Sequence, residues 1–362
     1  MFFVSETASI VAVALVFTEY LNAIWELTAG TPFNLPITFI ISLLTIWTLT
    51  GINMFGVSLS GKFQVFFSMV KVGALGAIIG MTLTSFSTGN IQNFINPLWP
   101  ESFGWETILA VGAALRYSFF AFSGWEGATY MAEEVKEPQK TLPLSLFIGI
   151  GGVMLLYIGT NLGYLFQLDV QAITENKWVA TAAMQVVLGA TGGILISVAV
   201  AINAFGNIST QILCKSRTWH AMARDGLFFD KFKELHPVFQ TPNNALIGQG
   251  IWATVLLVFS LTATYLQSGS SGSNAYEIMI DFFSATSTIF NLLTFYAIYI
   301  LRKKWPTKER PYKALLYPWS MIVVLILYSA FFIITLITAF IPSMIGIALT
   351  LSGSFYYMKK IK

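Results

Sequence analysis

The chain has 362 residues, of which 56% are hydrophobic and only 10% charged, and its formal net charge is +3. A soluble domain of this length needs a charged surface that this composition does not provide, so we expect an integral membrane protein. The small net charge gives no indication of a nucleic-acid partner. The single cysteine, Cys214, excludes an internal disulfide and a cysteine-based metal cluster.

Apolar runs long enough to cross about 30 Å of hydrocarbon recur along the whole chain. They predict an all-α membrane protein with ten transmembrane helices in a single domain, residues 1–362, because a segment in lipid must satisfy its backbone hydrogen bonds internally. The predicted spans are 2–25, 36–54, 63–86, 106–131, 142–166, 192–215, 244–266, 276–301, 315–337 and 341–358.

Lysine and arginine are divided very unequally among the connections between these spans. If the connections alternate between two sides, 17 of the 20 basic residues lie on one side and one, Lys177, on the other, while Lys71 and Arg116 fall inside spans. Basic residues concentrate on the cytoplasmic side of membrane proteins. The pattern predicts a multi-pass protein of the cell membrane with both termini in the cytoplasm.

Three connections have a distinctive composition. Residues 169–189 predict a short amphipathic stretch at the outer surface, and residues 268–273 a flexible outer loop. Residues 223–232 interleave aromatic and charged side chains, which predicts an interfacial helix on the cytoplasmic side. The only histidines, His220 and His236, fall in the same basic connection, which argues against a metal site or histidine-based catalysis.

The fourth span contains a cluster of small residues, Ser123, Gly124 and Gly127, with Arg116 before it and Glu126 within it. Glycine weakens a helix interior and allows the backbone to open. An opened helix presents unpaired amides and carbonyls at the middle of the bilayer, where they can bind a zwitterion. The alternative is that the small residues let another helix pack closely. Their spacing alone does not decide between the two.

Several short segments of the chain follow one another in an order and spacing that match a known family. Their combination is far more specific for that family than any single segment. They are Gly51-Ile-Asn53, Gly61-Lys-Phe-Gln64, Lys71-Val-Gly-Ala74, Phe120-Ala-Phe-Ser-Gly-Trp125, Glu133-Glu-x-x-x-Pro138, Leu142-Pro143, Phe205-Gly-Asn207, Ser216-Arg217, Ala221-Met-Ala-Arg224-Asp225-Gly226, Glu309-Arg-Pro-Tyr312 and Tyr317-Pro318. This set resembles amino-acid permeases of the amino acid–polyamine–organocation superfamily. It is most similar to their L-type and serine/threonine-exchanger branch.

The resemblance implies a leucine-transporter-like fold of two inverted five-helix repeats. Aligned in this way, the ten spans correspond to family helices three to twelve, and the first two helices are absent. The sequence starts inside a hydrophobic run, so we expect an N-terminally incomplete bundle. In the family, substrate lies between the broken first and sixth helices, and backbone amides of the first helix bind its carboxylate.

The resemblance also assigns roles within the fourth span. Phe120 corresponds to an aromatic gate over the substrate, the backbone of residues 121–123 to the binding site of the amino group, and residues 123–125 to the wall of the side-chain pocket. On a later helix, one asparagine corresponds to a pocket-lining position, although hydrogen bonding between helices is an equal alternative for it. The expected substrate-binding residues are Phe120, Ala121, Phe122, Ser123, Gly124, Trp125 and Asn207.

Lys71 is the expected coupling residue. It lies about nine residues into its span, and a buried lysine readily loses its proton. The resemblance places this lysine where other members bind a sodium ion, which favours exchange or proton coupling. The alternative is a structural salt bridge to Glu126 or Asp281. Asp281 could instead lie near the outer surface, and Glu6 has no assigned role.

The expected function is therefore secondary active transport of amino acids by alternating access, proton-linked or by exchange, without a cofactor or a metal. The alternative is an inactive remnant or an accessory membrane subunit, because the first helix is missing unless further N-terminal helices or a partner chain supply it. An enzyme is not expected, since the sequence has no zinc-binding spacing, no paired catalytic acids and no GxSxG motif.

Overall fold

The computed structural model describes residues 5–55, 60–95, 102–130, 135–268, 273–310, 314 and 316–361. These residues are mostly helical, and no strand occurs among them. Two of the motif segments, at 133–134 and 311–312, lie outside the described residues. The elements are α1 (Ser5–Ala29), α2 (Leu35–Met54), α3 (Ser60–Thr84), η1 (Ile91–Phe94), α4 (Trp105–Ala121), α5 (Gly127–Tyr130), α6 (Pro138–Gln167), α7 (Val170–Glu175), α8 (Val179–Arg224), η3 (Asp230–Lys233), α9 (Asn243–Ser268), α10 (Ser273–Lys304), α11 (Trp319–Thr338) and α12 (Phe340–Ile361).

A helix lies in each of the ten predicted spans, which confirms the all-α architecture. Among the described residues, seven helices are long and apolar enough to cross a membrane: α1, α2, α6, α8, α9, α10 and α11. In the other three, the apolar or helical part is shorter: Ser68–Thr84 within α3, Phe340–Gly353 within α12, and the 17 residues of α4. The inverted repeat itself stays a prediction.

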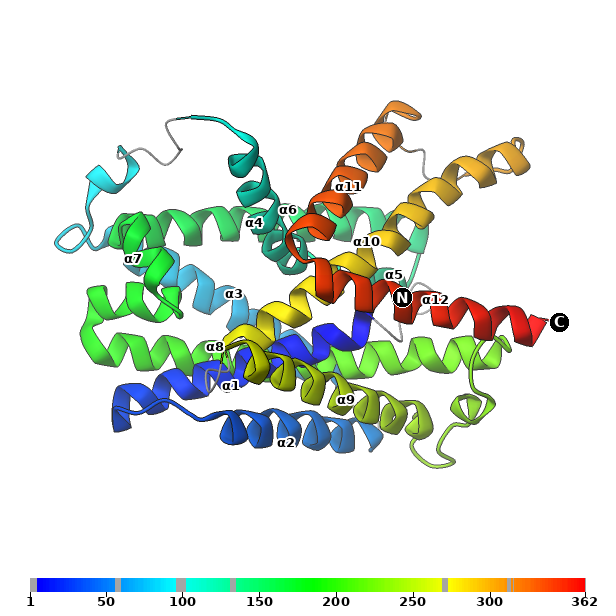
Figure 1. Ribbon diagram of the computed structural model, residues 1–362, viewed down its shortest axis with the longest axis horizontal. Coiled ribbons are helices and arrows are strands. Elements are labelled where there is room, and N and C mark those ends of the chain that lie inside the picture. Colours follow the sequence, from blue (N-terminus) through cyan, green and yellow to red (C-terminus); the bar gives the residue numbers. More distant parts are fainter. Residues whose placement is uncertain are drawn as a thin grey trace.

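Helix α1 forms the centre of the bundle. It packs most extensively against α8 and α10, and α2 and α9 complete the layer around it (Figure 1). Small side chains such as Ala8, Ala12 and Ala14 are fully buried, which lets the neighbouring helices approach closely. By contrast, α6 exposes large apolar side chains, with Phe147 at 81% and Leu155 at 69% exposed. This face of α6 is suited to contact lipid.

Helix α8 is longer at both ends than the predicted span 192–215. It starts at Val179, bends at Gly189, whose φ of 66° and ψ of −161° are not helical, and continues to Arg224. The predicted surface stretch 169–189 therefore becomes α7 and the first turns of α8. Residues after 215 remain helical because Ser216 and Trp219 are buried in the protein and do not face water.

The predicted interfacial helix at 223–232 is wrong. Helix α8 ends at Arg224, and only the short 3₁₀ helix η3 follows, from Asp230 to Lys233. The rings of Phe228 and Phe232 lie 5.4 and 5.6 Å from that of buried Trp219. These aromatic residues pack on α8 and α9. In a helix on the membrane surface they would face lipid instead.

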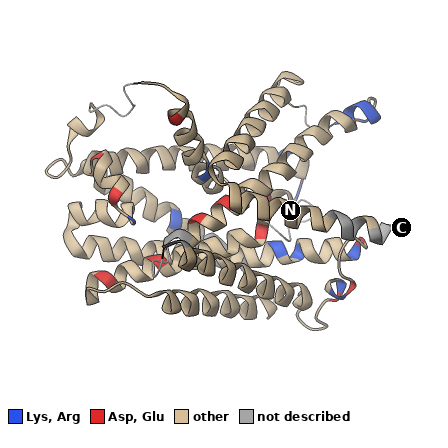
Figure 2. Cartoon of the chain, in the orientation of Figure 1, with Lys and Arg blue, Asp and Glu red and all other residues tan. Residues whose placement is uncertain are grey.

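Lysine and arginine gather at the end of the bundle where α8 and α10 finish (Figure 2). The last turn of α10 carries Arg302, Lys303 and Lys304, and the last turn of α8 carries Arg224. This clustering agrees with the charge asymmetry of the sequence. The predicted outer loop 268–273 lies largely outside the described residues.

Candidate functional site

The fourth span is broken, which decides between the two alternatives that its small residues left open. Helix α4 ends at Ala121, residues 122–126 form turns, and α5 begins at Gly127. Gly124 has a φ of +96°, a conformation that side chains with a Cβ rarely adopt. Its amide donates to Oε2 of Glu126 at 3.1 Å, which closes the turn. The glycine is therefore required by the conformation of the break.

Helix α6 holds the broken end of α4 in place. The hydroxyl of Tyr157 donates to the carbonyl of Ala121 at 3.1 Å, and its ring lies edge-to-face with Phe122 at 5.1 Å. Within the break, the hydroxyl of Ser123 donates to the carbonyl of Phe120 at 2.6 Å. The carbonyl of Phe120 also accepts from the backbone amide of Ser123 at 3.1 Å, so backbone and side-chain donors together satisfy the carbonyls at the end of α4.

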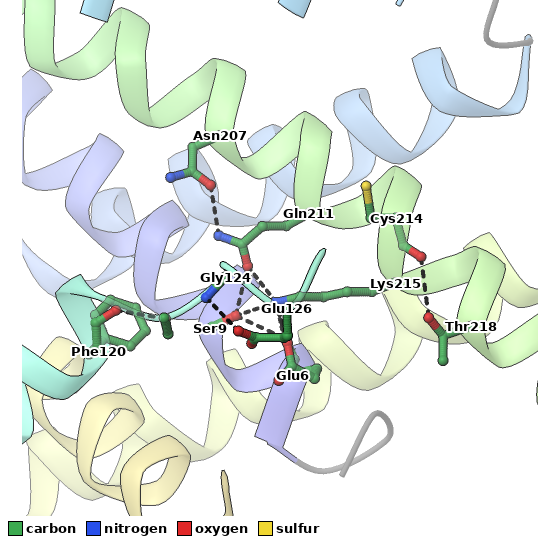
Figure 3. A network of polar contacts seen from close by, with 11 residues as sticks. Glu6, Ser9, Phe120, Gly124, Glu126, Asn207, Gln211, Cys214, Lys215 and Thr218 are labelled. Atoms are coloured by element: carbon green, nitrogen blue, oxygen red, sulfur yellow. Dashed lines mark hydrogen bonds and ion pairs between the residues drawn. The ribbon is translucent and has the colours of Figure 1, made fainter. Parts of the chain in front are cut away.

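A buried polar cluster lies on the side of α1 and α8. Nζ of Lys215 lies 3.0 Å from Oε2 of Glu6, and it donates to the Glu6 carbonyl at 2.9 Å and to Oε1 of Gln211 at 2.6 Å. It also donates to the Ser9 hydroxyl, which in turn donates to Gln211. The side chains of Lys215 and Glu6 are only 10% and 4% exposed. We refer to Glu6, Ser9, Gln211 and Lys215 as the α1–α8 cluster (Figure 3).

The spacing along α8 explains the geometry of this cluster. Asn207, Gln211 and Lys215 are four residues apart, so their side chains share one face of the helix. Nε2 of Gln211 donates to Oδ1 of Asn207 at 2.9 Å, extending the network by one turn. The stripe faces the first turns of α1, which carry Glu6 and Ser9 (Figure 3). A chain of hydrogen bonds thereby links the two helices.

A cavity of about 490 Å³ lies between the break and the α1–α8 cluster. The described residues that line it come from α1, α3, α4, α5, α6 and α8 and from the turn between α4 and α5. Four of these residues are charged, two with each sign: Glu6, Glu126, Lys71 and Lys215. A polar cavity of this size, walled by unwound backbone and hydrogen-bonding side chains, suits a small polar molecule.

Sequence comparison agrees with this architecture. A family model described as amino acid permease matches residues 1–358. The chain belongs to the amino acid permease family.

Curated relatives of this permease family member are amino acid transporters and exchangers. It is 29% identical to the serine/threonine exchanger SteT of Bacillus subtilis (strain 168), with 89% of this chain and 70% of the relative covered. It is 26% identical to the human cystine/glutamate transporter, covering 83% of this chain and 56% of that protein. For the mouse large neutral amino acids transporter small subunit 2, identity is 27%, over 84% of this chain and 54% of the relative. The chain thus spans about half the length of most of these relatives.

The cavity of this permease family member collects most of the residues predicted for the site. Its lining includes Phe120, Ala121, Ser123, Gly124 and Asn207, together with Lys71. The ring of Phe120, the residue predicted as the gate, packs edge-to-face on the ring of Phe283 with 5.3 Å between their centroids. This contact holds the Phe120 ring in position.

Phe122 and Trp125 are not among the lining residues of this cavity. They border a smaller one of about 80 Å³ and are 38% and 41% exposed. The break rotates them away, because a turn with a left-handed glycine does not continue the helical progression of side chains.

The predicted salt bridges of Lys71 are not found. The ion pairs formed by the described residues do not include Lys71, and Asp281 pairs with Arg116 of α4 instead. Asp281 is therefore an interior residue joining α10 to α4, and not a surface residue near the outer end. Lys71 remains a cavity residue whose charge faces the space between the helices.

Lys215 was not predicted as a site residue, and Glu6 had no predicted role. The span that ended at residue 215 placed Lys215 in a cytoplasmic connection. The signal that could have found it was the four-residue spacing of Asn207, Gln211 and Lys215, which continues one polar stripe beyond the apolar run.

Substitution of Gly124 tests whether the conformation of the break matters for binding. Gly124→Ala has space for its Cβ but strains a residue with positive φ, at a cost of about 1–2 kcal/mol. We expect weaker ligand binding in the cavity with a modest loss of thermal stability. The matched control is Gly149→Ala on α6, where the added Cβ also meets nothing within 4 Å. Equal binding by both variants would contradict a role for the break.

Proposed function

We propose that this chain carries out secondary active transport of a small amino acid across the cell membrane, with the cavity as the substrate site. The observation that carries the proposal is the cavity of about 490 Å³ at the break between α4 and α5. Membership of the amino acid permease family and the printed functions of the relatives support it. The substrate's amino group is assigned to the backbone of residues 121–123, with Phe120 as the gate.

The direct test is purification of the whole chain and reconstitution in liposomes. Equilibrium binding and uptake are measured for radiolabelled L-serine, L-leucine, L-cystine and L-glutamate, with and without an unlabelled amino acid inside the vesicles. Saturable uptake that accelerates in preloaded vesicles supports exchange. A monodisperse protein without binding or uptake would contradict transport by this chain alone and favour an inactive or accessory role. Activity restored in native membranes would then indicate that a further chain is required.

Lys71 is the proposed coupling residue, since it lines the cavity as a charge without an ion-pair partner among the described residues. A charged group within a membrane domain is costly and usually functional. We expect Lys71→Gln to reduce proton-gradient-driven uptake by roughly tenfold or more while binding persists. Uptake is compared across pH gradients of both signs. An unchanged gradient dependence would assign coupling elsewhere.

The proposed topology places both termini in the cytoplasm. The gathering of Lys and Arg at the end where α8 and α10 finish supports this orientation (Figure 2). Reporter fusions at each end of the chain test it. Activity only of a reporter that works outside the cell would show that the termini lie on the outer side, which contradicts the proposed orientation.

A further inference from the structure

The α1–α8 cluster has features that a purely structural contact between two helices does not need. Glu6 and Lys215 could each have been a small apolar residue, as Ala8, Ala12 and Ala204 are in the same helix pair. Instead both ions are buried, and burying an ion pair among helices costs several kcal/mol per ion before the attraction is counted. Both ions also line the cavity. A cost of this kind is usually retained for a reason other than stability.

The charges around the cavity cancel. Glu6 and Lys215 neutralise each other at 3.0 Å, and the other two charged residues among those described, Lys71 and Glu126, carry opposite signs. A ligand with a net charge would enter a low-dielectric space in which the described wall residues offer no net counter-charge. A zwitterion with an uncharged side chain keeps the balance and can use Ser9, Gln211 and Asn207 for hydrogen bonds.

We propose that the Glu6–Lys215 pair acts as a charge filter, which keeps the cavity neutral and selects amino acids that carry no net charge. This inference rests on the proposed function and names the substrate class of the same site. Removing either partner exposes the charge of the other. Glu6→Gln leaves an uncompensated Lys215 and favours anionic ligands, whereas Lys215→Gln leaves an uncompensated Glu6 and favours cationic ligands.

The magnitude follows from Coulomb's law. At an effective dielectric constant of about 20, a unit charge roughly 8–10 Å from a ligand charge changes the affinity by about tenfold or more. We therefore expect the binding ratio of L-glutamate to L-serine to rise about tenfold in Glu6→Gln, and that of L-lysine to L-serine to rise about tenfold in Lys215→Gln. The double variant Glu6→Gln/Lys215→Gln should return to the selectivity of the parent.

Cys214 gives a second readout that needs no transport activity. It is the only cysteine in the chain, it is half-buried, and it lines the same cavity. Its modification rates with cationic and anionic methanethiosulfonates, each divided by the rate of the neutral methyl reagent, report the sign of the local charge. Glu6→Gln should raise the anionic rate relative to the cationic one, and Lys215→Gln should lower it. Cys214→Ser serves as the blank.

Glu6→Gln and Lys215→Gln each break a buried ion pair and can therefore destabilise the fold. Lys71→Gln and Glu126→Gln provide a second set of variants in which no ion pair among the described residues is broken. Lys71→Gln makes the cavity more negative by one unit and should lower the ratio of anionic to cationic modification rates at Cys214. Glu126→Gln makes the cavity more positive by one unit and should raise that ratio. The charge filter is overturned if folded Glu6→Gln and Lys215→Gln keep the parental thiol ratio and the parental selectivity, or if Cys214 reacts with none of the reagents. Loss of all amino acid binding with the expected thiol ratios would overturn the proposed function but not the cavity electrostatics.

Discussion

Lys215→Met is expected to lower the free energy of unfolding by about 3–5 kcal/mol, because it leaves the carboxylate of Glu6 buried without its counter-charge. Lys215 also serves as the common donor to the Glu6 carbonyl, Ser9 and Gln211, so three acceptors lose a partner with it. Methionine keeps the length of the side chain, and the loss is therefore electrostatic rather than steric.

The measurement is equilibrium unfolding of the detergent-solubilised chain, with Lys177→Met as the matched control. Lys177 pairs with Glu19 at 2.9 Å, and its side chain is 41% exposed while that of Glu19 is 16% exposed. A pair with one solvated partner contributes less than a pair buried on both sides, so Lys177→Met should lose less stability than Lys215→Met. The double variant Glu6→Gln/Lys215→Met should recover part of the loss, since neither charge remains. Equal losses in Lys177→Met and Lys215→Met would refute the assignment of a buried pair.

Breaking the Arg116–Asp281 pair is expected to have an effect of similar size, about 3–5 kcal/mol for Arg116→Met or Asp281→Asn. Nη1 of Arg116 donates to Oδ1 of Asp281, and the two side chains are only 9% and 17% exposed. The pair joins α4, which leads into the break, to α10. Its loss should therefore loosen the approach to the cavity as well as the fold.

A double-mutant cycle separates the pair from its surroundings. The losses in Arg116→Met and Asp281→Asn should not add, because each variant removes the same interaction. Lys140→Met is the exposed counterpart: its pair with Glu137, with side chains 83% and 72% exposed, is solvated, so the variant should unfold like the parent. Strictly additive losses in the cycle would show that the two residues act independently.

The sequence predicted those features that depend on local composition. Lipid requires helices wherever apolar runs are long enough, so apolar runs predicted the all-helical architecture, and seven of the ten predicted spans contain a described helix long and apolar enough to cross a membrane. Ser123, Gly124 and Gly127 marked the fourth span as a place where the backbone can leave the helical conformation, although close helix packing explained the same residues equally well. Asn207 and Lys71 were expected near the site, and both line the cavity.

Features that depend on pairing between distant segments could not be predicted. Glu6 and Lys215 are 209 positions apart, and a single sequence does not indicate which charge on one helix meets which on another. For the same reason Asp281 was assigned to Lys71 or the surface, whereas it meets Arg116. The outward positions of Phe122 and Trp125 depend on the dihedral angles of the break, which residue spacing does not fix.

The hydrogen bond from Tyr157 to the carbonyl of Ala121 has a mechanical consequence. It holds the broken end of α4 against α6, while the Glu6–Lys215 ion pair holds α1 against α8 on the opposite wall of the cavity. Neither fastening spans the gap between the walls. The two walls are joined through α10, because the Arg116–Asp281 pair ties α4 to α10 and α10 packs against α1.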